Sequence, residues 1–339
     1  MNNIISVIIP CWNEERHISD MLDCLLKQKF QDWCAYCVDD QSTDGMAEVI
    51  KAYQAKDERI RYVCRDREPK GGQTCRNIGM KLARDAKYVT FFDADDLIAP
   101  YCLEQRVAFM EQHPELGCGV FPIIGYFNDL QEEQSPVFGF KTFEDDLMAM
   151  LNLSIPMAVS TNVYRVEALH ENNISWDENV RSMQDSDFSF QVILSGMPYD
   201  YARDAKADYF YRMHDNGVAG QIYKPAHIES HVYLIKKVIK AITKKYGNSY
   251  DSYIGVYIAR MLLKMRKYVD YKTLKTIPWV NQHSSYKLRI LIYTLCGQRL
   301  WRLFFRKYRT LSMQMNNKWQ SQTIDVRAKL LERGATLPQ

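Results

Sequence analysis

The sequence Tyr88-Val89-Thr90-Phe91-Phe92-Asp93-Ala94-Asp95-Asp96 joins an apolar run directly to a cluster of three carboxylates. The run of β-branched and aromatic residues predicts a buried strand. Burying three like charges behind that strand would be costly. We therefore expect the cluster at the C-terminal edge of the strand, facing water, a metal ion or both, because ligands bind at that edge in open α/β sheets.

Around this stretch, the first part of the chain alternates strand-like and helix-like patterns. The patterns predict strands near residues 4–9, 34–38, 60–63 and 87–92, and helices near 16–28, 46–55, 74–84 and from about 100 onward. Such alternation is typical of an α/β domain with a mostly parallel sheet and right-handed crossovers.

Three of these strands end in residues suited to binding a nucleotide. Trp12 follows the first strand, Asp40 the second, and the Asp93–Asp96 cluster the fourth. In a parallel sheet these positions share one edge, where a tryptophan offers a stacking surface, a carboxylate can accept the imide N–H of uracil, and carboxylates can hold a divalent cation. Taken singly, each has a plainer explanation as a loop anchor, a cap or turn acceptor, or a solvated turn.

The order of these features resembles the nucleotide-binding half of a family 2 glycosyltransferase with the GT-A fold. The resemblance covers residues 4–110, extends more loosely to about residue 220, and does not cover 221–339. It rests on Ser6-Val7-Ile8-Ile9-Pro10, Asn13-Glu14-Glu15, Val38-Asp39-Asp40-Gln41-Ser42-Thr43-Asp44-Gly45, Gly71-Gly72, Arg76-Asn77-Ile78-Gly79 and Phe92-Asp93-Ala94-Asp95-Asp96.

The resemblance implies a role for each matching residue on the donor side. Pro10, Trp12 and Glu14 would line the nucleoside pocket. Asp40 would read the base and favour a uridine donor, and Arg76 would order the pocket by pairing with a carboxylate, its alternative being a surface salt bridge.

Asp93-Ala94-Asp95 would form the family's D-x-D motif. Asp93 would contact the ribose side and Asp95 would bind the metal ion. The ion would be Mn²⁺ or Mg²⁺, because a site of hard oxygen ligands selects such ions. Asp96 stays open between a second ligand and a residue of the turn that follows.

Two later motifs imply the rest of the site. Gln184-Asp185-Ser186-Asp187-Phe188 resembles the family's Glu-Asp catalytic motif, with Gln184 where the family has Glu. Asp185 is then the general base, with Asp187 as the runner-up and a helix cap as the structural alternative. Tyr211-Arg212-Met213-His214 resembles a motif whose His can reach the metal or the diphosphate, so His214 is a second candidate metal ligand.

The charge of the chain is unevenly distributed. Residues 221–339 carry 23 Lys and Arg against 5 Asp and Glu, whereas residues 1–220 carry 21 against 36. We therefore predict a catalytic domain at 1–220, with a nucleotide-binding half at 1–115 and an acceptor-side half at 116–220, and a basic helical region at 221–339.

Within the basic region, residues 287–309 mix bulky apolar side chains with many cations. This pattern fits a helix lying on an anionic membrane surface, or a helical subdomain packed on the catalytic domain. No apolar run is long enough to predict a transmembrane helix, and nine scattered cysteines favour reduced thiols in the cytoplasm, with peripheral attachment to the inner face of the cell membrane under the first alternative. No nucleic-acid-binding motif is present, so nucleic acid is not an expected partner.

The combined pattern predicts an inverting, metal-dependent glycosyltransferase. It would move a sugar from a nucleotide-sugar, with a UDP-sugar favoured, to a hydroxyl of a glycan or lipid-linked acceptor. The alternative from another class is a non-catalytic nucleotide-sugar-binding protein, with Gln184 as a sign of decay. A nucleotidyltransferase is disfavoured because Pro10-Cys11-Trp12-Asn13 is not a glycine-rich phosphate loop.

Overall fold

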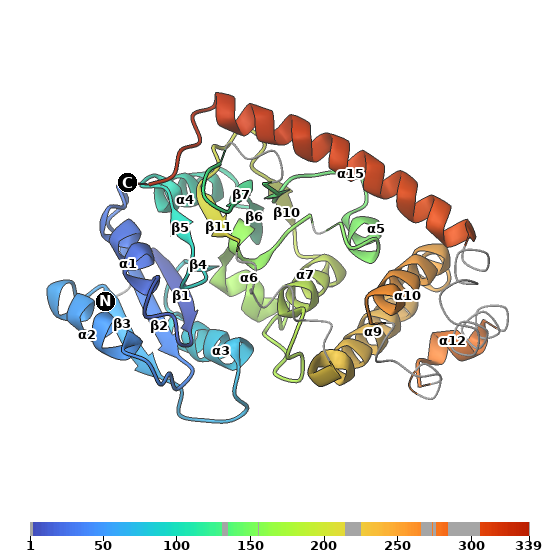
Figure 1. Ribbon diagram of the computed structural model, residues 1–339, viewed down its shortest axis with the longest axis horizontal. Helices are drawn as coiled ribbons and strands as arrows, with labels where there is room; N and C mark the ends of the chain where they lie inside the picture. The colour runs from blue at the N-terminus through green and yellow to red at the C-terminus, as the bar shows by residue number, and fades with distance from the viewer. Residues whose placement is uncertain are drawn as a thin grey trace.

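A computed structural model describes residues 3–130, 135–154, 156–213, 225–265, 273, 276–283 and 306–338. Its main element is a seven-stranded sheet (Figure 1). The strand order is β10 (Tyr199–Tyr201), β6 (Cys118–Val120), β9 (Asn162–Arg165), β4 (Tyr88–Phe91), β1 (Ile5–Cys11), β2 (Trp33–Asp39) and β3 (Ile60–Cys64). Only β9 runs antiparallel to its neighbours in this sheet, so the predicted α/β fold with a mostly parallel sheet is confirmed.

Helices cover both faces of the sheet, because strand residues alternate between two apolar cores. Ile5, Val7 and Ile9 of β1 enter one core, and Ile8 enters the other. The first core receives α1 (Ile18–Leu26), α2 (Met46–Lys56) and α4 (Cys102–Gln112), and the second receives α3 (Gly72–Leu82), α6 (Val166–Glu171) and α7 (Gln184–Ser195). Helix α3 lies so close to β1 that a Cβ at Gly79 would come within 2.4 Å of Ile8 Cγ2.

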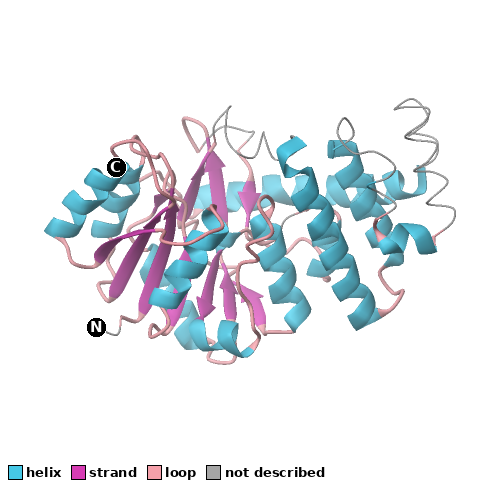
Figure 2. Cartoon of the chain, turned by 90° about the horizontal axis from the view of Figure 1, so that it is seen from below, coloured by secondary structure: helices cyan, strands magenta, loops and turns pink. Residues whose placement is uncertain are grey.

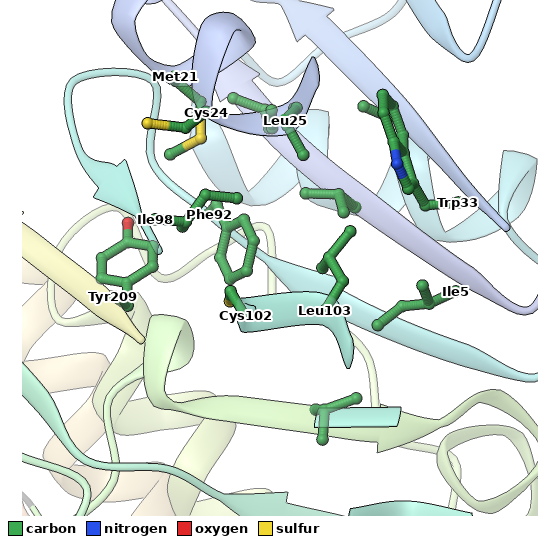
Figure 3. Close-up of a cluster of buried hydrophobic side chains, with 14 of the residues drawn as sticks. Ile5, Met21, Cys24, Leu25, Trp33, Phe92, Ile98, Cys102, Leu103 and Tyr209 are labelled. Atoms are coloured by element: carbon green, nitrogen blue, oxygen red, sulfur yellow. The ribbon is translucent and has the colours of Figure 1, made fainter. Parts of the chain in front are cut away.

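A second, four-stranded sheet begins directly after the carboxylate cluster. Its order is β5 (Leu97–Ile98), β11 (Tyr209–Arg212), β7 (Ile123–Tyr126) and β8 (Val137–Phe138). Tyr209 of β11 reaches back into the first core, where its ring centroid is 5.1 Å from that of Phe92 (Figure 3). The turn that carries Asp93–Asp96 is therefore held between the two sheets.

The basic C-terminal part contributes helices α9 (Pro225–Tyr246), α10 (Asp251–Met265), α12 (Pro278–Gln282) and α15 (Arg306–Glu332). Helices α9, α10 and α12 share an apolar core with α7 and with α5 (Asp146–Leu151) at the end of the molecule away from β1–β3 (Figure 2). Helix α15 crosses back over the second sheet (Figure 1), where Leu330 packs with Ile124 and Phe210. None of the described helices is long and apolar enough to cross a membrane.

One fully buried ion pair joins α4 to the segment that enters β11. The Arg106 guanidinium donates to both carboxylate oxygens of Asp208 at 2.8 and 2.9 Å, and both side chains are completely buried. Arg106 also donates to Thr90 Oγ1 of β4 at 3.0 Å and to the carbonyl oxygen of Ser160 at 2.9 Å. These bonds compensate the cost of burying the guanidinium and fix the second sheet relative to the first.

We expect Asp208→Ala to lower the free energy of unfolding by about 3–5 kcal/mol, because Arg106 would keep a buried charge without its partner. Urea denaturation measures the change. Lys87→Met is the matched control, since it breaks the half-exposed Lys87–Glu111 pair and should cost at most about 1 kcal/mol. Equal losses in the two variants would contradict a special role for the buried pair.

Candidate active site

The loops that follow β1 and β2 form one hydrogen-bonded unit. Asn13, in the left-handed region with φ of 54°, accepts the Thr43 N–H at 2.8 Å and donates its own backbone N–H to Ser42 Oγ at 3.0 Å. Glu15 Oε2 accepts the Gly45 N–H at 3.0 Å. The Asn-Glu-Glu and Asp-Gly motifs therefore hold the two loops in register, and asparagine suits the positive φ.

Trp12 stands on this edge with 52% of its surface exposed. The Lys70 ammonium lies 4.6 Å from the centroid of its ring, which is a cation–π distance. Pro10, two residues earlier, is half-buried and paired in register with Val38 of β2. The structure thus leaves the Trp12 ring exposed for stacking, with the Lys70 ammonium beside it, a contact that no sequence motif predicts.

Two predicted carboxylates of the nucleoside pocket already have partners. Asp40 is buried, and its Oδ1 accepts from Arg65 Nε at 2.5 Å and from the Gly71 N–H at 3.3 Å. Glu14 Oε2 is 3.2 Å from His17 Nδ1. Arg65 directly follows β3, and the pairing neutralises Asp40 at the sheet edge.

The carboxylates of the D-x-D turn have unequal environments. Asp93 and Asp95 are half-exposed, whereas Ala94 and Asp96 are buried. The Tyr209 hydroxyl donates to Asp96 Oδ2 and accepts the Asp93 N–H at 3.0 Å. Burial, reinforced by Asp95 and Asp93, raises the pKa of the Asp96 carboxyl well above its usual value.

A neighbouring arginine completes this turn. The Arg212 N–H donates to Asp96 Oδ1 at 2.7 Å, and Arg212 Nε donates to the carbonyl oxygen of Asp95 at 2.7 Å. Since both oxygens of Asp96 are engaged, the expectation that the whole cluster faces water or metal is wrong for Asp96. Its role is to hold the turn, because a buried carboxylate needs hydrogen-bond donors.

Arg76 joins the turn to the helix that carries the predicted base. Its Nη2 donates to Asp93 Oδ1 at 2.7 Å, and its Nη1 donates to Gln184 Oε1 at 2.9 Å. Its guanidinium carbon also lies 4.7 Å from the centroid of the Trp176 ring. Arg76 therefore brings α3, the D-x-D turn and α7 together.

Asp185 lies in the first turn of α7 and is half-buried. Burial raises the pKa of the Asp185 carboxyl to about 6; the nearby Arg76 charge opposes the shift and the Asp93 charge adds to it. At neutral pH such a group is mostly ionised, yet more basic than an ordinary aspartate.

Asp187, the alternative base, is engaged elsewhere. Its Oδ1 and Oδ2 lie 2.7 and 2.9 Å from Lys237 Nζ of α9, and Oδ2 also accepts from Gln191 Nε2 at 2.8 Å. The same lysine contacts Asp177 Oδ2 at 2.7 Å. Asp187 thus ties α7 to the basic helices, which leaves Asp185 as the carboxylate beside the D-x-D turn.

A divalent cation would fit this edge of the sheet if protein carboxylates and a bound substrate coordinate it together. Among the described residues, no three His, Cys, Asp or Glu side chains gather to form a metal site, and His214 lies outside the described residues. The half-exposed Asp95 carries the hard oxygen donors that Mg²⁺ and Mn²⁺ prefer. One or two carboxylates with substrate phosphates and water are the usual surroundings of Mg²⁺, so the residues present fit such an ion.

Comparisons with known proteins place this geometry in a family. Residues 6–172 match the model of glycosyl transferase family 2. The chain belongs to this family. As a family 2 member it is a glycosyltransferase that acts on a nucleotide-sugar donor.

Relatives and solved structures agree with the assignment. This family 2 chain is 26% identical over 270 residues to the uncharacterized glycosyltransferase EpsJ of Bacillus subtilis, covering 77% of this chain and 76% of EpsJ. It is 27% identical over 208 residues to the poly(ribitol-phosphate) β-N-acetylglucosaminyltransferase TarS of Staphylococcus aureus, covering 60% of this chain but only 35% of TarS. The crystal structure of TarS 1–349 in complex with UDP-GlcNAc superposes with a TM-score of 0.62 at 20% identity, over 98% of this chain and 92% of that one, which shows the shared GT-A fold.

Several residues that build the site of this family 2 enzyme carry no sequence signal. Arg65 and Tyr209 contact Asp40 and Asp96, which are distant in sequence, and Gln73 Oε1 accepts from Gln184 Nε2 of α7. None of the three belongs to a motif that indicates its role. A cavity of about 470 Å³ lies between α15 and the segment after β8, and none of the predicted site residues that the structure describes lines it. The candidate site is therefore the sheet edge and not this cavity.

We expect Tyr209→Phe to weaken both the fold and the donor site, because Asp96 and the Asp93 N–H lose the hydroxyl they share. The free energy of unfolding should fall by about 1–3 kcal/mol, and the KM for the donor should rise. Urea denaturation and initial rates measure the two effects. Tyr53→Phe, which removes an exposed hydroxyl bonded to Asp23, is the control and should change the free energy of unfolding by no more than about 0.5 kcal/mol. A loss of stability in Tyr53→Phe as large as that in Tyr209→Phe would contradict a special role for the buried Tyr209 hydroxyl.

Proposed function

We propose that the chain is an inverting, metal-dependent glycosyltransferase that transfers a sugar from a UDP-sugar to a hydroxyl of a glycan or lipid-linked acceptor. The observation that carries the proposal is the contact of Arg76 with both Asp93 and Gln184, which places the D-x-D turn next to the helix turn that carries Asp185. Burial raises the pKa of the Asp185 carboxyl to about 6. A base with a pKa near the working pH combines sufficient ionisation with sufficient basicity.

The chemistry is a single displacement. The acceptor hydroxyl attacks the anomeric carbon of the sugar, the nucleoside diphosphate leaves from the opposite face, and the configuration inverts. Asp185 accepts the proton of the attacking hydroxyl at its carboxylate. Arg76 holds Asp93 in place beside this event through the bond at 2.7 Å.

Asp95, with His214 as a second candidate, would hold the divalent cation, which when bound offsets charge on the leaving diphosphate as a Lewis acid. Trp12 would stack on the base, and Pro10 and Glu14 would line its pocket. Asp40 would face the base while Arg65 balances its charge. The UDP-GlcNAc complex of TarS supports a uridine donor for this chain.

The basic region supports the proposed acceptor class and location. A glycan or lipid-linked acceptor fits an enzyme whose residues 221–339 carry a large excess of cations, and an anionic membrane surface would attract that region. Most of the apolar and basic segment 287–309 lies outside the described residues. A non-catalytic nucleotide-sugar-binding protein is the weaker alternative, because Asp185 and the Asp93-Ala94-Asp95 turn are both retained.

We expect Asp185→Asn to lower turnover by about 10²–10⁴-fold, the usual contribution of a general base. UDP binding, measured by calorimetry, should stay near the wild-type value because Asp185 does not belong to the nucleoside pocket. In the wild type, kcat should fall on the acid side with an apparent pKa near 6, since the protonated carboxyl cannot accept a proton. An Asp185→Asn enzyme that keeps most of its turnover would remove Asp185 from the role of base.

We expect a panel of UDP-, GDP- and dTDP-sugars with Mn²⁺ to show nucleoside diphosphate release from UDP-sugars above all. The release should stop when a chelator removes the metal and return when Mn²⁺ or Mg²⁺ is restored. Slow donor hydrolysis without acceptor would separate an enzyme from a binding protein. Release that continues unchanged in chelator would contradict metal dependence.

A variant assigns the metal to its residue. Asp95→Ala should remove the Mn²⁺-dependent part of UDP binding in calorimetry, because the half-exposed carboxylate is the proposed ligand. Lys240→Gln, at an exposed position of α9 remote in sequence from the motifs, is the control and should bind as the wild type does. Unchanged Mn²⁺-dependent binding by Asp95→Ala would refute the ligand assignment.

A further inference from the structure

Gln184, the residue that departs from the family's Glu-Asp motif, lies in a hydrogen-bond chain between α7 and α3. Its Nε2 donates to Gln73 Oε1 at 2.6 Å, and its Oε1 accepts from Arg76 Nη1 at 2.9 Å. Arg76 Nη2 continues the chain to Asp93 Oδ1 at 2.7 Å. The chain thus runs from the donor-side turn to the residue next to Asp185.

The groups at the two ends of this hydrogen-bond chain, the Glu178 carbonyl and the Arg76 guanidinium, determine which atom donates in each bond. Gln73 Nε2 donates to the backbone carbonyl of Glu178 at 3.3 Å, and a carbonyl can only accept, so Gln73 presents its oxygen to residue 184. Arg76 can only donate. Residue 184 must therefore donate on one side and accept on the other, which an amide does and a carboxylate does not.

Two glycines provide the space for this chain. A Cβ at Gly71, where φ is 140°, would lie 2.5 Å from Gln73 Oε1. A Cβ at Gly72 would lie 3.2 Å from Arg76 Nη1 and 3.5 Å from Gln184 Oε1. The Gly71-Gly72 motif at the start of α3 therefore lets the two amides and the guanidinium approach one another.

We propose that Gln184 is a positioning residue whose amide locks the first turn of α7 onto α3, so that Asp185 is held in register with the Arg76–Asp93 pair. The proposal rests on the proposed function, in which Asp185 is the base. It explains why this protein has Gln where the family motif has Glu: the amide can donate to Gln73 and accept from Arg76.

The neutral amide also preserves the charge balance around the base. Arg76 forms its ion pair with Asp93, and its positive charge lowers the pKa of Asp185 against the effect of burial. A carboxylate at residue 184 would add a negative charge next to Asp185 and oppose that influence.

The first test replaces Gln184 by methionine, which is similar in length and makes neither bond. We expect kcat to fall about tenfold or more, because a small displacement of a catalytic group is costly, while the donor KM and UDP binding stay within about threefold. Gln191→Met is the matched control: Gln191 is on the same helix and bonds Ser175 O and Asp187, but not α3. Wild-type kcat in Gln184→Met, or an equal loss in Gln191→Met, would overturn the proposal.

A double-mutant cycle with Gln73→Met tests the chain itself. If the two amides act as one unit, the double variant should lose no more kcat than Gln184→Met alone, since contacting residues couple. Independent, multiplicative losses would show that they do not. Gln184→Glu tests the effect of charge, which a purely structural role would not predict. The added negative charge should raise the pKa of Asp185 and shift the acid limb of the pH profile of kcat to higher pH. An unshifted acid limb would contradict this effect.

These outcomes are separable from a failure of the proposed function. If Asp185→Asn keeps its turnover, Asp185 is not the base and the reason for positioning it disappears. If Asp185→Asn is inactive while Gln184→Met turns over normally, the base stands and the positioning role alone is refuted.

Discussion

The D-x-D turn depends on one carboxylate that never reaches solvent. Asp96 is fully buried and is compensated by the Tyr209 hydroxyl and the Arg212 N–H. Both partners belong to β11, more than a hundred residues later in the chain. Because a buried carboxylate without donors is costly, the turn can take this shape only when β11 has docked beside β5. The geometry of the turn that carries Asp93 and Asp95 therefore depends on residues of β11.

Arg76 extends this dependence to the predicted base. One guanidinium contacts Asp93 of the D-x-D turn and Gln184, the first residue of the helix that carries Asp185. A planar group with several fixed donors suits a junction of this kind, since each bond constrains the direction of the next. Hydrogen bonds through one side chain, and not loops alone, therefore set the spacing between the D-x-D turn and the first turn of α7, which carries the proposed base.

The sequence predicted which strand ends share one edge of the sheet, because each strand is identified by a short apolar run in the sequence. Strand ends at Trp12, Asp40 and Asp93 must meet once the strands are parallel, and the apolar runs identify those strands. The fate of Asp96 was not predictable in the same way: its partner is 113 residues away, and no periodicity marks that contact. Arg65 and Gln73 illustrate the same limit, since their partners lie 25 and 111 residues away. From sequence alone, every residue of an acidic cluster is expected to be exposed. Contacts between residues distant in sequence decide which of them is buried.

The spacing of two aspartates on α7 shows how packing resolved what the motif left open. Residues two apart on a helix point about 200° from each other, so Asp185 and Asp187 cannot serve the same side. Asp187 is bound by Lys237 of α9, and the apolar core shared by α7, α9 and α10 fixes which way that side faces. Asp185 is consequently left toward Arg76 and Asp93. The basic C-terminal helices thus do more than carry positive charge: by engaging Asp187 they determine which carboxylate of the motif is directed to the sheet edge.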